Sequence, residues 1–161
     1  MTRPRFAPVL SGTGLFAAAL LAVGLASPAF AQEVRLTPAE IARLPKAGTG
    51  PGTSGLAGLR ITILSGDPTR EGPYTIALRV PAHTSIAAHT HRDARKAVVV
   101  SGMWYFGYGS RADPARVKRL PPGSFYTEPA ADPHFALTRD QPAVVYITGW
   151  GPSDTVYVAR R

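Results

Sequence analysis

The sequence contains no cysteine, and this absence excludes several kinds of structure and chemistry. Disulfide bonds cannot hold the fold together, so its stability has to come from packing. Thiolate metal sites and cysteine nucleophiles are excluded as well. Carboxylates are scarce, with 10 Asp and Glu against 18 Lys and Arg. The basic residues are scattered and do not form a stripe with interleaved aromatics, so we expect no nucleic-acid partner.

The first 31 residues have the organisation of a signal peptide. They begin with a basic stretch that contains Arg3 and Arg5, continue with the apolar run LFAAALLAVGLA, and end in the small residues SPAFA. The apolar run is too short for a transmembrane helix, which needs about 20 residues. We therefore expect cleavage after Ala31, a periplasmic or secreted protein, and no membrane span in the mature chain.

Residues 32–57 are expected to form a flexible arm that leads into the domain. Thr37, Pro38 and Glu40 suit the N-cap, the first helical position and the capping-box acid of a short helical turn. The Gly-rich stretch GTGPGTSGLAG follows this turn. A chain of 161 residues provides one domain, which we place at 58–161.

From Leu59 onward, short apolar or alternating runs are separated by turn residues. About nine such runs in roughly 100 residues are typical of an all-β sandwich or small barrel. A single helical turn is predicted between Ala112 and Leu120, in ADPARVKRL. The runs are LRITIL, YTIALRV, SIAAHTH, KAVVVSG, MWYFGYG, SFYTE, HFALT, AVVYITGW and DTVYVA.

Three of the four histidines are candidate metal ligands. His89 and His91 are two residues apart, so in a strand both side chains point to the same face. His134 opens a later strand-like run, whereas His83 occupies a turn and is expected to face solvent. The pattern favours a metal site over a merely polar strand face. Imidazoles suit Zn, Fe, Ni and Cu without selecting one of them.

Two segments, PAHTSIAAHTHRDARKAVVVSG and GSFYTEPAADPHF, resemble the signature segments of the cupins. The wider order of motifs is similar to that of small secreted single-domain cupins, from about Thr37 to Val158. The resemblance implies an all-β cupin double-stranded β-helix, also called a jelly-roll barrel. Cupins carry many different reactions, so the resemblance does not fix the activity. It implies metal ligands at His89, His91 and His134, and turn residues at Gly102 and Pro129.

The chain departs from the cupin pattern at several positions. Cupins usually carry a glutamate that three or four residues separate from the second histidine, and here those positions are Arg95 and Lys96. Glycines that are usual in the two segments are replaced by His83 and Ala131. Without the usual glutamate, a divalent metal could be bound more weakly or be absent. Glu128 or Asp132 could replace that carboxylate in space.

Three functional hypotheses follow. The first is a metal-dependent enzyme, oxygenase-like or isomerase-like, with a small-molecule pocket in the barrel. The second is a non-catalytic periplasmic binder of an anionic small molecule, with Arg95 and Lys96 as ligand-binding residues and a degenerate metal site. The third is a barrel that serves only as an interaction surface. Cupins commonly pair through their sheets, so the resemblance also implies a homodimer.

Overall fold

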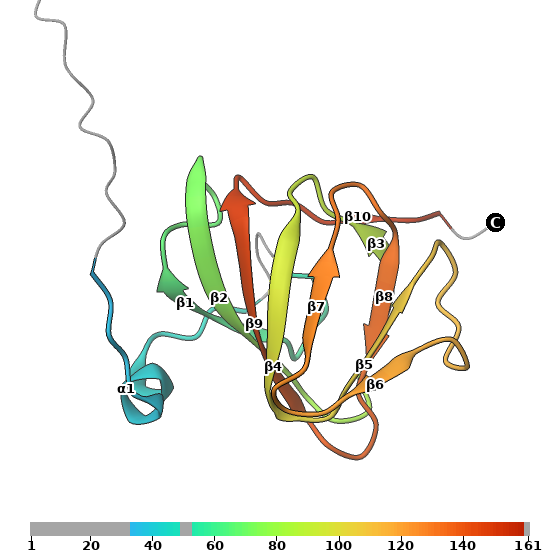
Figure 1. Ribbon diagram of the computed structural model, residues 1–161, viewed down its shortest axis with the longest axis horizontal. Helices are drawn as coiled ribbons and strands as arrows, with labels where there is room; N and C mark the ends of the chain where they lie inside the picture. Colours follow the sequence, from blue (N-terminus) through green and yellow to red (C-terminus); the bar gives the residue numbers. More distant parts are fainter. Residues whose placement is uncertain (1–32, 49–52, 160–161) are drawn as a thin grey trace, which may run out of the picture.

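The computed structural model describes residues 33–48 and 53–159, and the predicted signal peptide lies outside them. These residues form one short helix and ten strands in two antiparallel sheets (Figure 1). The first sheet contains, in spatial order, β1 (Arg60–Ser65), β2 (Gly72–Val80), β9 (Ala143–Gly151), β4 (Arg95–Gly102) and β7 (Phe125–Glu128). The second contains β10 (Val156–Tyr157), β3 (Ser85–Thr90), β8 (His134–Leu137), β5 (Trp104–Tyr108) and β6 (Lys118–Leu120). The predicted all-β class is confirmed.

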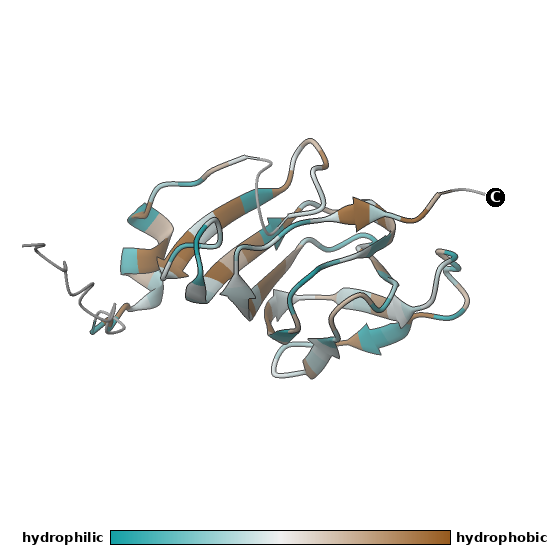
Figure 2. Cartoon of the chain, turned by 90° about the horizontal axis from the view of Figure 1, so that it is seen from above, coloured by the Kyte–Doolittle hydropathy of each residue, from teal (hydrophilic) through white to brown (hydrophobic). Residues whose placement is uncertain are grey.

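The core lies between the sheets because the strands alternate buried and exposed side chains. In β4, Ala97 and Val99 are buried while Lys96 and Val98 are exposed. Figure 2 colours the strands by hydropathy and shows both brown and teal or pale positions along them. Full burial of an apolar side chain as large as that of Val99 stabilises by about 1.5–3 kcal/mol. Other core residues are Leu59, Ile61, Ile76, Leu78, Val80, Ile86, Phe106, Leu120, Val145 and Ile147.

Two kinds of turn shape the barrel. The chain leaves the first sheet at Gly102, whose φ is 74°, and a Cβ there would collide with the carbonyl of Pro142. Only glycine fits this position without strain. His83 and Ala131, which stand where the cupin pattern has glycine, adopt φ values of 55° and 59°. Both positions therefore have the left-handed backbone conformation that glycine favours, although neither residue is a glycine.

The predicted helical turn in Ala112–Leu120 is wrong. Asp113 starts a turn instead, in which its side-chain Oδ1 accepts a hydrogen bond from the Ala115 amide at 2.9 Å. The chain then extends, and Lys118–Leu120 pair with β5 as strand β6. The short side chain of Asp113 satisfies backbone donors in a turn, and strand pairing outweighs the weak helical preference of the following residues.

The N-terminal helix α1 (Pro38–Arg43) has the predicted capping box. The Glu40 amide donates to Thr37 Oγ1 at 3.3 Å, and the Thr37 amide donates to Glu40 Oε2 at 2.6 Å. Beyond the helix, Ala47 exchanges two backbone hydrogen bonds with Ile61 of β1. Part of the predicted arm therefore lies against the barrel. Within the described ranges, no helix is long and apolar enough to cross a membrane.

Candidate metal centre

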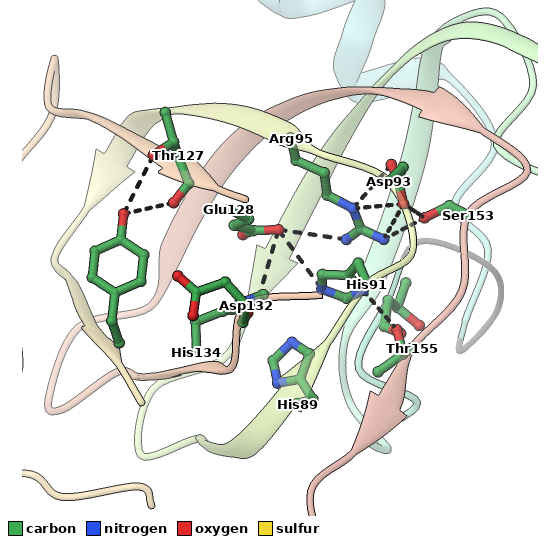
Figure 3. Close-up of polar contacts among 12 residues, drawn as sticks. His89, His91, Asp93, Arg95, Thr127, Glu128, Asp132, His134, Ser153 and Thr155 are labelled. Carbon is green, nitrogen blue, oxygen red and sulfur yellow. Dashed lines mark hydrogen bonds and ion pairs between the residues drawn. The ribbon is translucent and has the colours of Figure 1, made fainter. Parts of the chain in front are cut away.

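Strand pairing brings the three candidate histidines together. His89 of β3 lies directly opposite His134 of β8, and His91 follows β3 by one residue. The ring centroids of the three pairs are 4.5 to 5.0 Å apart, and all three side chains are buried. One ligand atom from each residue lies within 4.8 Å of the other two. Residues 45 positions apart in the sequence therefore converge on one point (Figure 3).

Each imidazole is oriented by a backbone carbonyl. The Nδ1 atom lies 2.7 Å from the Ala87 oxygen in His89, 2.6 Å from the Asp154 oxygen in His91, and 3.0 Å from the Asp132 oxygen in His134. A carbonyl only accepts hydrogen bonds, so Nδ1 must carry the proton in all three rings. The lone pair of each neutral ring is thus on Nε2, which is the arrangement found around metal-ligating histidines.

Burial keeps these imidazoles neutral. It lowers the pKa of His89 to about 4, with the Ala87 carbonyl opposing the shift. Burial also lowers the pKa of His91 and of His134, and the nearby Arg95 guanidinium acts in the same direction on both. Metal binding requires unprotonated imidazoles. The histidines are therefore in the ligating form at neutral pH before any ion arrives.

Glu128, the last residue of β7, is directed at this cluster. Its Oε2 lies 3.7 Å from Nε2 of His91 and 3.7 Å from Nε2 of His134. The side chain is buried, and burial raises its pKa against the opposing influence of Arg95. Neither Glu128 Oε2 nor His134 Nε2 has a hydrogen-bond partner among the described residues. A carboxylate and imidazole lone pairs therefore face one another, an arrangement that a bound cation would stabilise.

Arg95 points into the barrel but is held by acidic and polar groups. Its Nε lies 3.3 Å from Oδ2 of Asp93, and its Nη1 lies 3.6 Å from Oε2 of Glu128. Its Nη2 donates to the Ser153 hydroxyl (Figure 3). The same nitrogen donates to the Asp154 carbonyl at 3.2 Å. The same carbonyl accepts from His91. Arg95 and the histidine cluster are therefore joined through one backbone group.

The other predicted polar residues lie away from the cluster. Lys96 is exposed and alternates to the face of β4 opposite Arg95, so the structure separates the two bases. The Asp132 side chain is exposed, and only its carbonyl contacts His134. His83 is exposed in its turn, 3.9 Å from Asp140, as expected for a residue that faces solvent. Of the two acids considered as replacements, Glu128 is the one directed at the histidines.

A narrow, partly open pocket leads to the cluster. Seven buried polar side-chain atoms lack a hydrogen-bond partner in the described part of the chain, and five of them belong to residues that line this pocket. Buried polar groups are normally paired, so this concentration indicates a place for a ligand or water. The remaining lining residues are His89, His91 and Arg95 together with the apolar Leu78, Ile86, Phe106, Ala136 and Ile147. The five residues are Ser54, Trp104, Tyr126, Glu128 and His134.

Sequence reasoning missed Ser54, which belongs to the predicted flexible arm. Ser54 and Thr53 are buried. The Tyr157 hydroxyl donates to the Ser54 carbonyl, and the Thr155 hydroxyl donates to the Thr53 carbonyl at 2.5 Å. The C-terminal strand β10 thus holds the arm at the pocket. No local signal in the sequence indicates this contact, because it joins residues about 100 positions apart.

No family model and no curated protein matches the sequence. Solved structures do match it. The polyketide cyclase RemF from Streptomyces resistomycificus superimposes with a TM-score of 0.60 at 14% identity, over 79% of this chain and 88% of that one. An RmlC-like cupin from Shewanella frigidimarina NCIMB 400 gives a TM-score of 0.54 at 15% identity, over 81% and 96%.

A third match is the DMSP lyase DddQ from Ruegeria pomeroyi DSS-3, with a TM-score of 0.56 at 18% identity over 72% of this chain. The chain spans only 61% of that lyase and 63% of the protein in a second DMSP lyase structure. Further matches are also described as cupins or cupin-like. The chain therefore has the cupin fold, and the expected jelly-roll barrel is confirmed. At these identities the likeness concerns the fold alone.

Proposed function

We propose that this cupin-fold protein binds one divalent transition-metal ion through His89, His91 and His134 and acts on a small molecule in the adjoining pocket, as an oxygenase-like or isomerase-like enzyme. The observation that carries the proposal is the common orientation of the three rings. In each, Nδ1 donates to a carbonyl and Nε2 is left to bind an ion. Three protein ligands leave coordination positions open for water or substrate.

The charge of the site supports a cation. The three histidines are neutral, and Arg95, Asp93 and Glu128 together carry a formal charge of −1 when both carboxylates are ionised. The usual cupin set of three histidines and one glutamate has the same charge. The arginine at the usual glutamate position is therefore compensated by two acids. Imidazole ligands favour Zn, Fe, Ni or Cu over Mg or Ca.

The pocket walls indicate what kind of molecule would bind. A divalent ion at such a site acts as a Lewis acid that polarises a bound oxygen. Trp104 Nε1 has no partner among the described residues and can only donate a hydrogen bond, so it calls for an acceptor on the ligand. The Ser54 hydroxyl is also unpartnered there and can donate or accept. We infer a small ligand with at least one oxygen acceptor and an apolar body that contacts Ile86, Phe106 and Ile147.

The competing hypothesis, an anion binder without metal, gains no support from this geometry. Arg95 contacts the carboxylates of Asp93 and Glu128, and Lys96 lies on the other face of its strand. An incoming anion would have to displace a carboxylate from the guanidinium. The reactions carried by similar folds are diverse, since a lyase, a cyclase and an isomerase are among them. They support enzyme chemistry in general and do not select one reaction.

Elemental analysis of the purified protein after metal loading tests the proposal. We expect about one ion per chain in the wild type and a large loss in His89→Ala and His134→Ala. His83→Ala is the matched control, because this histidine is exposed in a turn. Far less than one ion per chain in the wild type, or equal retention in all four proteins, would contradict the proposed metal site.

We also propose that the mature protein acts in the periplasm or outside the cell, which rests on the signal-peptide pattern of residues 1–31. The test is expression of the full chain in a Gram-negative host, followed by mass spectrometry of the periplasmic fraction. A mature protein that begins at Gln32 is expected. A full-length chain recovered only from the cytoplasm would contradict export.

A further inference from the structure

Arg95 and Glu128 occupy facing positions on two neighbouring strands. Arg95 is the first residue of β4, Glu128 is the last residue of β7, and the two are direct partners in the antiparallel register. Both side chains point into the barrel, with relative exposures of 2% and 4%. The Cβ atoms of directly opposite residues on one face of an antiparallel pair are about 4.5–5.5 Å apart, so their side chains reach into the same space. A carboxylate on β7 can therefore reach the space that a carboxylate on β4 would fill.

The position of Glu128 Oε2 agrees with metal ligation. Two donors on one ion, each about 2.1 Å from it, can be at most about 4.2 Å apart. Both contacts of Oε2, 3.7 Å to His91 Nε2 and 3.7 Å to His134 Nε2, lie within that limit. The three-histidine group, with a spread of 4.8 Å, needs only to contract slightly. Oε2 also lacks a hydrogen-bond partner within the described ranges.

We propose that Glu128 is the fourth protein ligand of the metal, so that the carboxylate has moved from β4 to the facing position on β7 and Arg95 occupies the vacated place. This inference rests on the proposed function, because it needs an ion at the three histidines. It assigns a ligand that the spacing after the H-x-H pair does not indicate. It also gives Arg95 the role of a positioning residue, which directs Oε2 without binding the ion.

The surroundings of Arg95 explain how an arginine can lie beside a cation. Asp93 contacts its Nε at 3.3 Å, and the Ser153 hydroxyl accepts from its Nη2 and donates to Asp93 Oδ1 at 2.8 Å. These contacts hold the guanidinium and offset its charge. The 3.6 Å separation between Arg95 Nη1 and Glu128 Oε2 exceeds hydrogen-bond length. Glu128 is therefore attracted by Arg95 but remains available to a metal.

Two substitutions at Glu128 distinguish a ligand from a structural ion-pair partner. Glu128→Gln removes the charge with little change in shape, and Glu128→Asp keeps the charge but shortens the reach by one methylene. Glu71→Gln is the matched control, because it makes the same substitution at an exposed side chain that does not line the pocket. Thermal melting of the metal-free proteins establishes that each variant folds.

The measurements are Zn²⁺ affinity, by competition with a chromophoric chelator, and the visible absorption of the Co²⁺-loaded protein, which reports the ligand set. If Glu128 is a ligand, both Glu128 variants lose at least about tenfold in affinity and change the Co²⁺ spectrum, whereas Glu71→Gln changes neither. Wild-type affinity and spectrum in Glu128→Asp, with weakening only in Glu128→Gln, would show a remote charge effect and overturn the inference.

The remaining outcomes separate this inference from the proposed function. Unchanged Zn²⁺ binding and an unchanged Co²⁺ spectrum in Glu128→Gln would overturn the role of Glu128, while the three-histidine site would stand if His89→Ala still abolished binding. Failure of the wild-type protein to bind either ion would overturn both.

Discussion

Arg95 Nη1 and Glu128 Oε2 lie 3.6 Å apart across the β4–β7 pair, and both side chains are buried. A buried ion pair adds little net stability, because both charges lose their hydration. Removing one partner is costly, however, since the other charge is then left buried without compensation. Here Arg95 also neutralises Asp93, so one cation serves two carboxylates. The charge balance of the buried site therefore depends on Arg95 more than on Asp93 or Glu128.

The first prediction is that Arg95→Met destabilises the metal-free protein strongly. Asp93 and Glu128 would be left as uncompensated buried charges, which typically costs about 3–5 kcal/mol. Urea unfolding at pH 8 measures the loss. Lys96→Met is the control, since this neighbour is exposed, and it should change the free energy of unfolding by less than about 0.5 kcal/mol. Similar small losses in both variants would mean that Arg95 is not needed to balance the acids.

The second prediction concerns Gly149 of β9, which lets Tyr74 and Asp93 meet. The Tyr74 hydroxyl donates to Asp93 Oδ2 at 2.6 Å, and a Cβ on Gly149 would collide with both side chains. Gly149→Ala should therefore destabilise the protein by about 1–3 kcal/mol, as overpacking generally does. Gly48→Ala is the matched control, because a Cβ there would meet no atom within 4 Å. Equal unfolding free energies for the two variants would contradict the predicted collision.

The third prediction is a loss of stability of the metal-free protein in mild acid. Burial lowers the pKa of His89 to about 4, from an ordinary value of 6.5, and lowers the pKa of His91 and His134 as well. Between pH 6.5 and 4 the unfolded chain then binds more protons than the folded one, so stability rises with pH. The raised pKa of Glu128 has the opposite effect on the pH dependence of stability, but it is a single group against three histidines.

Urea unfolding in a chelating buffer at pH 7.5 and pH 5 measures this effect. The wild type should lose stability at pH 5, and His91→Phe should lose less because one buried imidazole is gone. His83→Ala, which removes an exposed histidine, should behave like the wild type. Equal stability of the wild type at the two pH values would contradict the neutral, buried state of the cluster.

Much of the fold could be predicted from local patterns. Alternation of apolar and polar residues indicates strands, and the two-residue spacing places His89 and His91 on one face. The burial of His91, Asp93 and Arg95 follows the same two-residue period, although residues 92–94 are not in a strand. If the two-residue period of His89 and His91 is continued for four more residues, it predicts that Arg95 points inward together with Asp93. The alternation therefore predicts the inward direction of Asp93 and Arg95 as well as that of the two histidines.

Other parts of the site depend on long-range pairing that local patterns do not determine. Glu128 faces Arg95 only because β7 pairs with β4 in one particular register, and a shift by one residue would turn its side chain outward. The contact of Ser54 with Tyr157 joins the two ends of the domain. Such contacts result from the closure of the barrel, and no short segment encodes them.

The last prediction is that Tyr157 controls the mobility of the arm at the pocket. Its hydroxyl donates to the carbonyl of Ser54, which lines the pocket. Tyr157→Phe removes this hydrogen bond, at a cost of about 0.5–1.5 kcal/mol. Because local opening of the segment then costs less free energy, we expect faster amide hydrogen exchange in a peptide that covers residues 53–58.

Tyr108→Phe provides a control with the same chemistry elsewhere. The Tyr108 hydroxyl donates to the Thr127 carbonyl at 2.7 Å, between β5 and β7. This variant should lose a similar amount of stability and leave exchange in 53–58 unchanged. If both variants accelerate exchange in that peptide equally, the effect is global destabilisation and Tyr157 has no specific hold on the arm. Acceleration in Tyr157→Phe alone would mean that the hydrogen bond from β10 holds Ser54 in its place in the pocket wall.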